Sequence, residues 1–229
     1  MGKKTEPIYS NTKELLIHKG MELFALHGYT GVSLRQLASE CEVNLAAVGY
    51  HFGSKEGLYI AIWDYVISRF DEEYSFRLTS LHDAAVAAGD DSKQLAEVTA
   101  NLVRMLITFS LEVGRNNWVS QMLQWEAGHP TEAYDRVFGV IVEPTKDIAS
   151  TLTGGAWGID PESEECIIAG HGLLGLIFGF SSAHQAFLSH IGWDNLDPEK
   201  IEQIINVMTC MAQKSLGLPT SNNGVQSEI

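Results

Sequence analysis

Three helix-start signals within the first 45 residues constrain the fold of this chain more strongly than any other feature of its sequence. Asn11 with Glu14, and Ser33 with Gln36, have the spacing of a capping box, in which a side chain accepts a hydrogen bond from the first turn of a helix. Asn44 is a third residue of a type that caps helices. Apolar residues follow each signal at helical spacing, so we predict three helices in this region.

Short connections separate the three predicted helices. The first helix is predicted to end at Gly28, and its apolar face contains Gly20, which lets a neighbouring helix approach closely. Only "CEV" lies between the second helix and Asn44. Gly53 then ends the short third helix, and Ser54 caps a long helix that continues through residue 78. A helix, a short turn and a short helix form the helix-turn-helix layout.

The rest of the chain also has helical periodicity, without strand-like alternation or an internal repeat. The predicted helices span residues 93–114, 116–128, 131–152, 162–192 and 198–217. The helix over 131–152 is expected to be bent or divided at Pro144, and loops are predicted over 82–92 and 153–161.

The predicted fold class is therefore all-α, with an N-terminal helix-turn-helix three-helix domain and a larger helical ligand-binding and dimerisation domain. We place these domains at residues 1–58 and 59–218, and a disordered tail at 219–229.

Charge divides the chain in the same way. The formal net charge is −14, from 15 basic and 29 acidic residues. Residues 1–58 contain six basic and six acidic residues, so the whole negative charge lies in residues 59–229. An acidic body is repelled by phosphate, whereas a neutral N-terminal segment is free to approach nucleic acid.

Several other classes of protein are disfavoured. Three cysteines, Cys41, Cys166 and Cys210, lack metal-ligand spacing and indicate a reducing, cytoplasmic setting. The longest apolar stretch, residues 167–180, is shorter than the ~20 residues that span a bilayer, and His171 interrupts it. We also find no apolar signal core, phosphate-binding loop, dinucleotide fingerprint or nucleophile–base arrangement. We therefore expect no membrane association, no enzymatic activity and no cofactor.

The stretch "ELFALHGYTGVSLRQLASECEVNLAAVGYHFGSKEGLY" resembles the DNA-binding domain of the TetR family of transcriptional regulators. The resemblance covers about residues 12 to 60, and the "AAV-x-YHFGSKEGLY" variant is similar to a branch with a C-terminal domain of the CerR type. It implies that Arg35 reaches a guanine edge, for which a guanidinium fork is suited, and that Ser33 contacts a phosphate. Tyr50, His51 and Lys55 would contact the DNA backbone. The recognition-helix residues that enter the major groove would be Asn44, Leu45, Ala46 and Ala47.

One position departs from the family pattern. The family usually has a tyrosine where Gly49 stands, and here the tyrosine is at position 50. Gly49 removes a side chain at the DNA-binding surface and weakens the helix. Tyr50 and His51 could instead pack between helices. The residues in this region that we assign to the core are Leu37, Cys41, Val48 and Phe52.

The resemblance implies a small-molecule effector inside the larger helical part. Large, adaptable side chains suited to apolar pockets occur between residues 102 and 129. At helical spacing, such a stripe can equally be ordinary core. The candidate ligand-binding residues are Met105, Phe109, Trp118, Met122, Trp125, His129, His171 and Phe178.

A metal site is the alternative for some of these positions. Glu126 and His129 have the i, i+3 spacing of a ligand pair, but no second such pair exists, so we predict no metal. His184 and His190 are further isolated histidines.

The last two long helices would form a four-helix interface in a homodimer, as the resemblance implies. Gly172, Gly175 and Gly179 would permit close helix packing there. The matching apolar stripe on the final helix would be Ile201, Ile204, Ile205 and Met208. A dimer would present two recognition helices to a near-palindromic double-stranded operator.

The sequence therefore predicts a TetR-like DNA-binding transcriptional regulator. The resemblance favours a repressor that an apolar or amphipathic effector releases from its operator. A transcriptional activator of the same fold, and a helical adaptor without a small-molecule ligand, are the alternatives.

Overall fold

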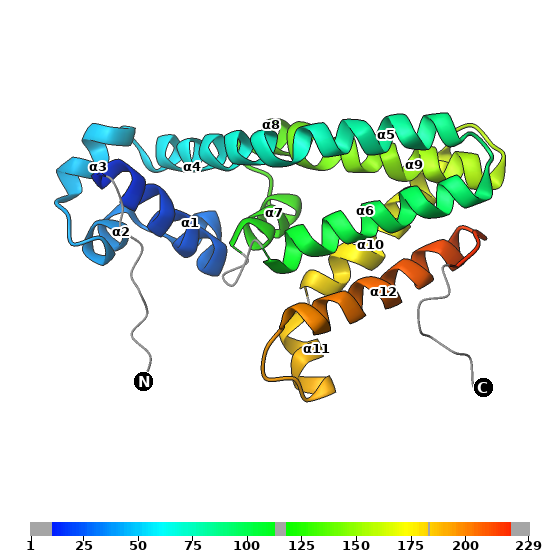
Figure 1. Ribbon diagram of the computed structural model, residues 1–229. Coiled ribbons are helices and arrows are strands. Elements are labelled where there is room, and N and C mark those ends of the chain that lie inside the picture. Colours follow the sequence, from blue (N-terminus) through cyan, green and yellow to red (C-terminus); the bar gives the residue numbers. More distant parts are fainter. Residues whose placement is uncertain (1–10, 113–117, 183, 221–229) are drawn as a thin grey trace. The chain divides into compact units, whose positions relative to one another are not determined.

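The computed structural model describes residues 11–112, 118–182 and 184–220 (Figure 1). Within these ranges it contains α-helices and two π-helical segments, and no β-strand, as the all-α prediction requires. The N-terminal elements are α1 (Thr12–Gly31), α2 (Leu34–Glu40), α3 (Leu45–Phe52) and α4 (Lys55–Phe70). The central elements are η1 (Asp71–Ser75), α5 (Phe76–Ala88), α6 (Ser92–Glu112), α7 (Trp118–Gly128), α8 (Tyr134–Val137) and η2 (Phe138–Val142). The C-terminal helices are α9 (Glu143–Trp157), α10 (Glu164–Ser182), α11 (His184–Ile191) and α12 (Pro198–Ser215).

The chain forms two compact units. Unit 1 comprises Met1–Arg69 and Trp118–Val137, and unit 2 comprises Phe70–Asn117 and Phe138–Ile229. Residues 118–137 therefore pack with the N-terminal helices although they are distant in sequence. The domain boundary expected between residues 58 and 59 stays a prediction, and most of the tail predicted at 219–229 lies outside the described residues.

In unit 1, α1 packs against α2 and α7, and its side chains also contact those of α4. A Cβ atom added at Gly20 of α1 would lie 2.7 Å from Cδ1 of Ile62 in α4, so the predicted close approach of another helix occurs there. Gly28 has φ +68°, which breaks the helical path of α1 where the sequence predicted an end. The core side chains with almost no solvent exposure include Leu16, Phe24, Leu37, Val48, Leu58, Ile62, Trp63 and Met122.

Unit 2 is a helical bundle in which α9 packs against α5 and α10, and α6 packs against α12 (Figure 1). Its core contains fully buried Leu102, Ile148 and Ile177. A buried hydrogen bond of 2.9 Å joins the Gln213 side-chain nitrogen to the Ala96 carbonyl, and so ties α12 to α6.

Two predicted loops are partly helical. Residues 82–88 belong to α5, because the alanine-rich run "DAAVAA" favours helix, and Gly89 with φ +54° ends it. Residues 153–157 complete α9, which ends at the left-handed Gly158. A Cβ added at Gly155 would collide with the Gly89 carbonyl oxygen, so glycine is required there by close packing and does not mark a break.

Other boundaries differ in detail. The long helix predicted through residue 78 contains the π-helical segment η1. The helix predicted over 131–152 is divided by η2 just before Pro144, which occupies the first turn of α9 and needs no N–H partner there. Residues 162–192 form two helices, α10 and α11.

Within the described residues, no helix combines the length and apolar character that crossing a bilayer requires.

Candidate nucleic-acid interface

Side-chain caps fix the starts of the helices in the helix-turn-helix. Asn11 Oδ1 accepts from the Glu14 backbone N–H at 3.0 Å, and Ser33 Oγ accepts from that of Gln36 at 3.1 Å. Asn44 Oδ1 accepts from the Ala46 N–H at 2.9 Å. These three predicted caps are confirmed, because capping depends on residues close together in sequence.

The turn between α2 and α3 is closed by backbone hydrogen bonds. The Cys41 N–H donates to the Leu37 carbonyl at 3.0 Å, and the Val43 N–H donates to the Ala38 carbonyl at 2.9 Å. Between them, Glu42 has φ +54°, a left-handed conformation that is uncommon for a residue other than glycine. The turn thereby redirects the chain from α2 into α3 within three residues.

The inner face of this motif is apolar. Leu37, Cys41 and Val48 are buried as predicted, whereas Phe52 is only half-buried. Burial raises the pKa of the Cys41 thiol to about 11, so the thiol stays protonated and behaves as a small core side chain.

The outer face carries most of the residues predicted to contact DNA. Arg35 of α2 and the N-terminal residues of α3 are exposed, and Tyr50 retains 86% of its accessible surface. A side chain that packs between helices loses most of its contact with solvent. Tyr50 does not, so the alternative that it packs between helices is wrong. The exposed members of the predicted set are Ser33, Arg35, Asn44, Leu45, Ala46, Gly49 and Tyr50, and the half-buried members are Ala47, His51 and Lys55.

Aromatic contacts restrain the edge of this face. The rings of Tyr50 and His51 meet edge to face, with centroids 5.2 Å apart. The Lys55 ammonium nitrogen lies 4.6 Å from the centroid of the Tyr29 ring, a cation–π contact, and partial burial lowers the pKa of Lys55. Gly49 is open, since a Cβ placed there would meet no atom within 4 Å.

The predicted ligand-binding residues divide between the two units. Met105 and Phe109 on α6, and His171 and Phe178 on α10, belong to unit 2. Phe109 packs edge-on against Phe70 and Tyr74. Trp118, Met122, Trp125 and His129 belong to unit 1, where Met122 is fully buried. Ligand binding by this set stays a prediction.

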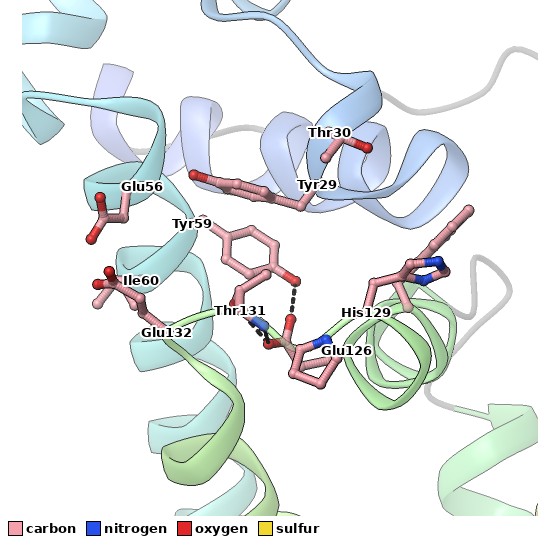
Figure 2. Close-up of a pocket in the computed structure, with 11 residues that line it drawn as sticks. Tyr29, Thr30, Glu56, Tyr59, Ile60, Glu126, His129, Thr131 and Glu132 are labelled. Atoms are coloured by element: carbon pink, nitrogen blue, oxygen red, sulfur yellow. Dashed lines mark hydrogen bonds between the residues drawn. The ribbon is translucent and has the colours of Figure 1, made fainter.

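Trp125 and His129 line a cavity of about 410 Å³ inside unit 1 (Figure 2). Its walls come from the end of α1, the first turns of α4 and residues 125–132. Trp125 also joins α7 to α1, because its indole N–H donates to the Ala25 carbonyl at 3.0 Å. A Cβ at Gly28 would lie 3.1 Å from the Trp125 ring, so this packing also depends on glycine.

Glu126 is the main residue at this cavity that the sequence did not explain. Its carboxylate has 1% exposure and accepts hydrogen bonds from the Tyr59 hydroxyl, the Thr131 N–H and the Thr131 hydroxyl, each at 2.7 Å (Figure 2). Burial and the bond to Glu126 raise the pKa of Tyr59. The only sign of this buried carboxylate in the sequence was an acidic residue within an apolar helix. Its partner Tyr59 could not be identified, because it is distant in the chain.

In the described part of the chain, no group of three or more His, Cys, Asp or Glu side chains is arranged to hold a metal ion. Glu126 and His129, the i, i+3 pair, differ in environment: the first is buried and the second is exposed. His190 is exposed, and the side chain of His184 lies outside the described set.

The apolar faces of α10 and α12 differ from the prediction. Ile201, Ile204, Ile205 and Met208 are buried within unit 2, where α12 packs against α6, so this stripe does not face a partner chain. The exposed apolar residues of these two helices are Ile167, Ile168, Leu176, Val207 and Met211.

The glycines of α10 also have separate roles. A Cβ at Gly170 would lie 3.0 Å from the backbone nitrogen of Ser150, so α10 approaches α9 at that position. At Gly172, Gly175 and Gly179 a Cβ would meet nothing within 4 Å. Among the described residues, the close packing expected of these three glycines is therefore not made.

Two families match the chain over most of its length. Residues 16–62 match the family described as "Bacterial regulatory proteins, tetR family". Residues 96–218 match the family described as "HTH-type transcriptional dual regulator CecR, C-terminal domain", so the C-terminal branch expected under the name CerR is that of CecR.

One relative and two solved structures are similar to the chain over most of its length. The chain is 26% identical over 198 residues to the HTH-type transcriptional dual regulator CecR of Shigella flexneri, covering 86% of this chain and 88% of that protein. The fold is similar to that of AibR, solved in complex with isovaleryl coenzyme A and operator DNA, with a TM-score of 0.59, 18% identity, and coverage of 88% and 97%. It is also similar to that of Mycobacterium smegmatis AmtR, with a TM-score of 0.58, 19% identity, and coverage of 96% and 92%.

Proposed function

The chain belongs to the TetR family of bacterial regulatory proteins, in the branch with a CecR-type C-terminal domain, and is a DNA-binding transcriptional regulator; on that premise we propose that it is a homodimeric repressor released from its operator by a small-molecule effector. The observation that carries the proposal is the outer face of α2 and α3. Arg35 and Tyr50 project from two capped helices and are free of the core of unit 1.

DNA contact by this face follows from its chemistry. The Arg35 guanidinium suits the O6 and N7 atoms of guanine. The Asn44 cap uses only Oδ1, so the amide nitrogen can donate to an adenine acceptor or to a phosphate. Small residues at 46 and 47 allow the backbone of α3 to approach the floor of the major groove, and the Ala methyl groups suit a thymine methyl.

The proposed dimer uses the exposed face of α10 and α12. Ile168, Gly172 and Leu176 lie at i, i+4 and i+8 on α10, and Val207 and Met211 lie at i and i+4 on α12. Such faces pack closely when glycine allows the helices to approach. The two recognition helices would then read half-sites separated by about 34–36 Å or a multiple of it.

Release by an effector requires a difference in affinity. A ligand can lower DNA occupancy only if it binds the conformation that is unfit for the operator more tightly than the DNA-bound one. AibR was solved with both an acyl coenzyme A and operator DNA, which supports a small-molecule effector for a protein of this fold.

Fluorescence anisotropy with duplex DNA from upstream of the protein's own coding sequence tests the proposal. We expect Arg35→Ala to weaken specific binding by about 1–3 kcal/mol, and the Tyr50→Ala/Lys55→Ala double variant to weaken it and to reduce the slope of log affinity against log salt by about one. Lys214→Ala, which removes an exposed positive charge in unit 2, is the matched control. Undiminished affinity in both test variants would refute the interface.

The dimer is tested by sedimentation velocity. Met211→Glu places a charge on the proposed face and should yield a monomer with unchanged helix content. Ile159→Glu, at a comparably exposed apolar residue outside α10 and α12, should leave the oligomeric state unchanged.

A further inference from the structure

We propose that the cavity in unit 1 is a binding site for a small organic cation, a protonated or quaternary amine attached to an apolar or aromatic body. The cavity is formed entirely by elements of unit 1, among them the end of α1 and the start of α4 (Figure 2). Its volume of about 410 Å³ falls within the ~300–1,000 Å³ of small-molecule sites. It is distinct from the apolar set on α6 and α10 that the sequence singled out in unit 2.

The walls of the cavity are aromatic. Tyr29, Tyr59 and Trp125 all line it, and the Tyr29 and Tyr59 rings are 4.9 Å apart at a tilt of 59°. Aromatic faces carry negative charge density, so several rings around one space attract a cation whose hydration is weak. Quaternary and substituted ammonium groups meet that description, and an apolar body attached to them gains contact with Trp125 and Ile60.

The ring of Tyr29, which lines the cavity, is already in contact with a cation of the protein itself. The Lys55 ammonium nitrogen lies over the Tyr29 ring at 4.6 Å from its centroid. Lys55 reaches this ring from the first turn of α4 and does not line the cavity itself. This ammonium group repels a ligand cation, so the attraction for the ligand has to come from Tyr59, Trp125 and the carboxylates that line the cavity.

The carboxylates make the site selective for positive charge. Glu56, Glu126 and Glu132 line the cavity, whose only ionisable nitrogen group is His129. The Glu126 carboxylate is fully engaged by Tyr59 and Thr131, so Glu56 and Glu132 are the groups left to meet a ligand. Both are exposed, and Figure 2 places them at one end of the cavity.

Glu56 and Glu132 are also close enough to affect each other. A hydrogen bond with Glu132 and the charge of Glu132 raise the pKa of Glu56. Burial, followed by the charges of Glu56 and Glu132, raises the pKa of Tyr29. Two carboxyl groups that share a site favour any partner that brings positive charge, because it removes their mutual repulsion.

The test is a ligand-observed NMR titration of the full chain, without DNA, at constant ionic strength. The probe is benzyltrimethylammonium, and its comparison is N,N-dimethylbenzamide, a neutral molecule of similar size. We expect saturable binding of the cation, about 2- to 30-fold tighter than that of the amide, which is the range that cation–π contacts give. Absence of saturable cation binding, or equal binding of the two probes, would overturn the proposal.

Variants locate the site. Glu56→Gln/Glu132→Gln should weaken cation binding about tenfold or more and leave amide binding unchanged, and both residues are exposed, so the fold should be retained. Tyr29→Phe keeps the ring and should retain binding. Glu162→Gln/Glu165→Gln makes the same change of charge at exposed positions in unit 2 and should have no effect. An equal loss in both double variants would show non-specific attraction and overturn the site, as would unaltered binding in the first.

Because the titration contains no DNA, its outcome is independent of operator binding. A chain that binds DNA but not the cation refutes this inference alone.

Discussion

The hydrogen bond between Tyr59 and Glu126 offers the sharpest test of how unit 1 is held together. Tyr59 has 3% exposure and Glu126 has 1%, and their oxygens are 2.7 Å apart. Replacing Tyr59 by Phe removes only the hydroxyl. The ring can keep its edge-to-face contacts with Phe24, at 5.0 Å, and with Trp63, at 6.1 Å, so no large cavity should form.

The expected cost follows from what the hydroxyl does. A hydrogen bond to a charged group contributes about 1.5–3 kcal/mol, and a buried acceptor that loses its donor is not compensated by water. The Glu126 carboxylate keeps its two bonds from Thr131, so it is left partly satisfied. We therefore expect Tyr59→Phe to lower the free energy of unfolding by about 2 kcal/mol.

Urea unfolding, followed by circular dichroism and tryptophan fluorescence, measures this change. Tyr50→Phe is the matched control: Tyr50 is largely exposed, so losing its hydroxyl should change stability by less than about 0.5 kcal/mol. A double-mutant cycle with Glu126→Gln should give a coupling energy of about 1 kcal/mol or more between the two side chains. A Tyr59→Phe effect as small as that of the control, or additive effects in the cycle, would refute the reasoning.

Three further outcomes are expected of single substitutions. Gly49→Ala should raise the free energy of unfolding by up to about 1 kcal/mol, because the position is helical and open. Gly20→Ala should lower the free energy of unfolding, because the new Cβ would lie 2.7 Å from Cδ1 of Ile62. Chemical denaturation of the two variants measures both changes. Burial lowers the pKa of His18, so the folded state binds its proton less readily than the unfolded state. The stability of the protein should therefore fall as pH drops from 7.5 through 6.5 towards the lowered pKa. Thermal melts at a series of pH values should show a smaller loss of stability for His18→Gln, and an identical pH dependence of the two proteins would contradict this.

What could be predicted from the sequence is what depends on near neighbours in the chain. The caps at Asn11, Ser33 and Asn44, and the glycine ends at Gly28 and Gly53, each involve residues within a few positions of one another. Their chemistry is the same in any fold, so the helix-turn-helix follows from the sequence.

What could not be predicted depends on contacts between distant segments. The pair Gly154–Gly155 suggests a break by composition, yet the Gly89 carbonyl lies where a side chain at 155 would be. The stripe beginning at Ile201 has the right spacing for a partner chain, but α6 covers it first. Helical spacing reports that a face is buried, and it does not report what buries it.

Glu126 shows the same limit for the site. In sequence, its spacing to His129 suggests a metal ligand pair, whereas in the structure its three donors come from Tyr59 and Thr131. A buried carboxylate without donors would be strongly unfavourable, so its partners had to exist. The sequence alone could not identify a tyrosine on a different helix as one of them.

Helix α3, the proposed recognition helix, depends on these distant contacts as well. With eight residues and an internal glycine, α3 is too short to be stable by itself. Its one fully buried side chain, Val48, anchors it to unit 1, whose helices α1 and α4 are in turn joined to residues 125–131 through Trp125 and Glu126. A ligand or substitution that moves residues 125–131 therefore acts on the same compact unit that presents α3. DNA affinity should respond to changes at Glu126 even though its side chain is buried.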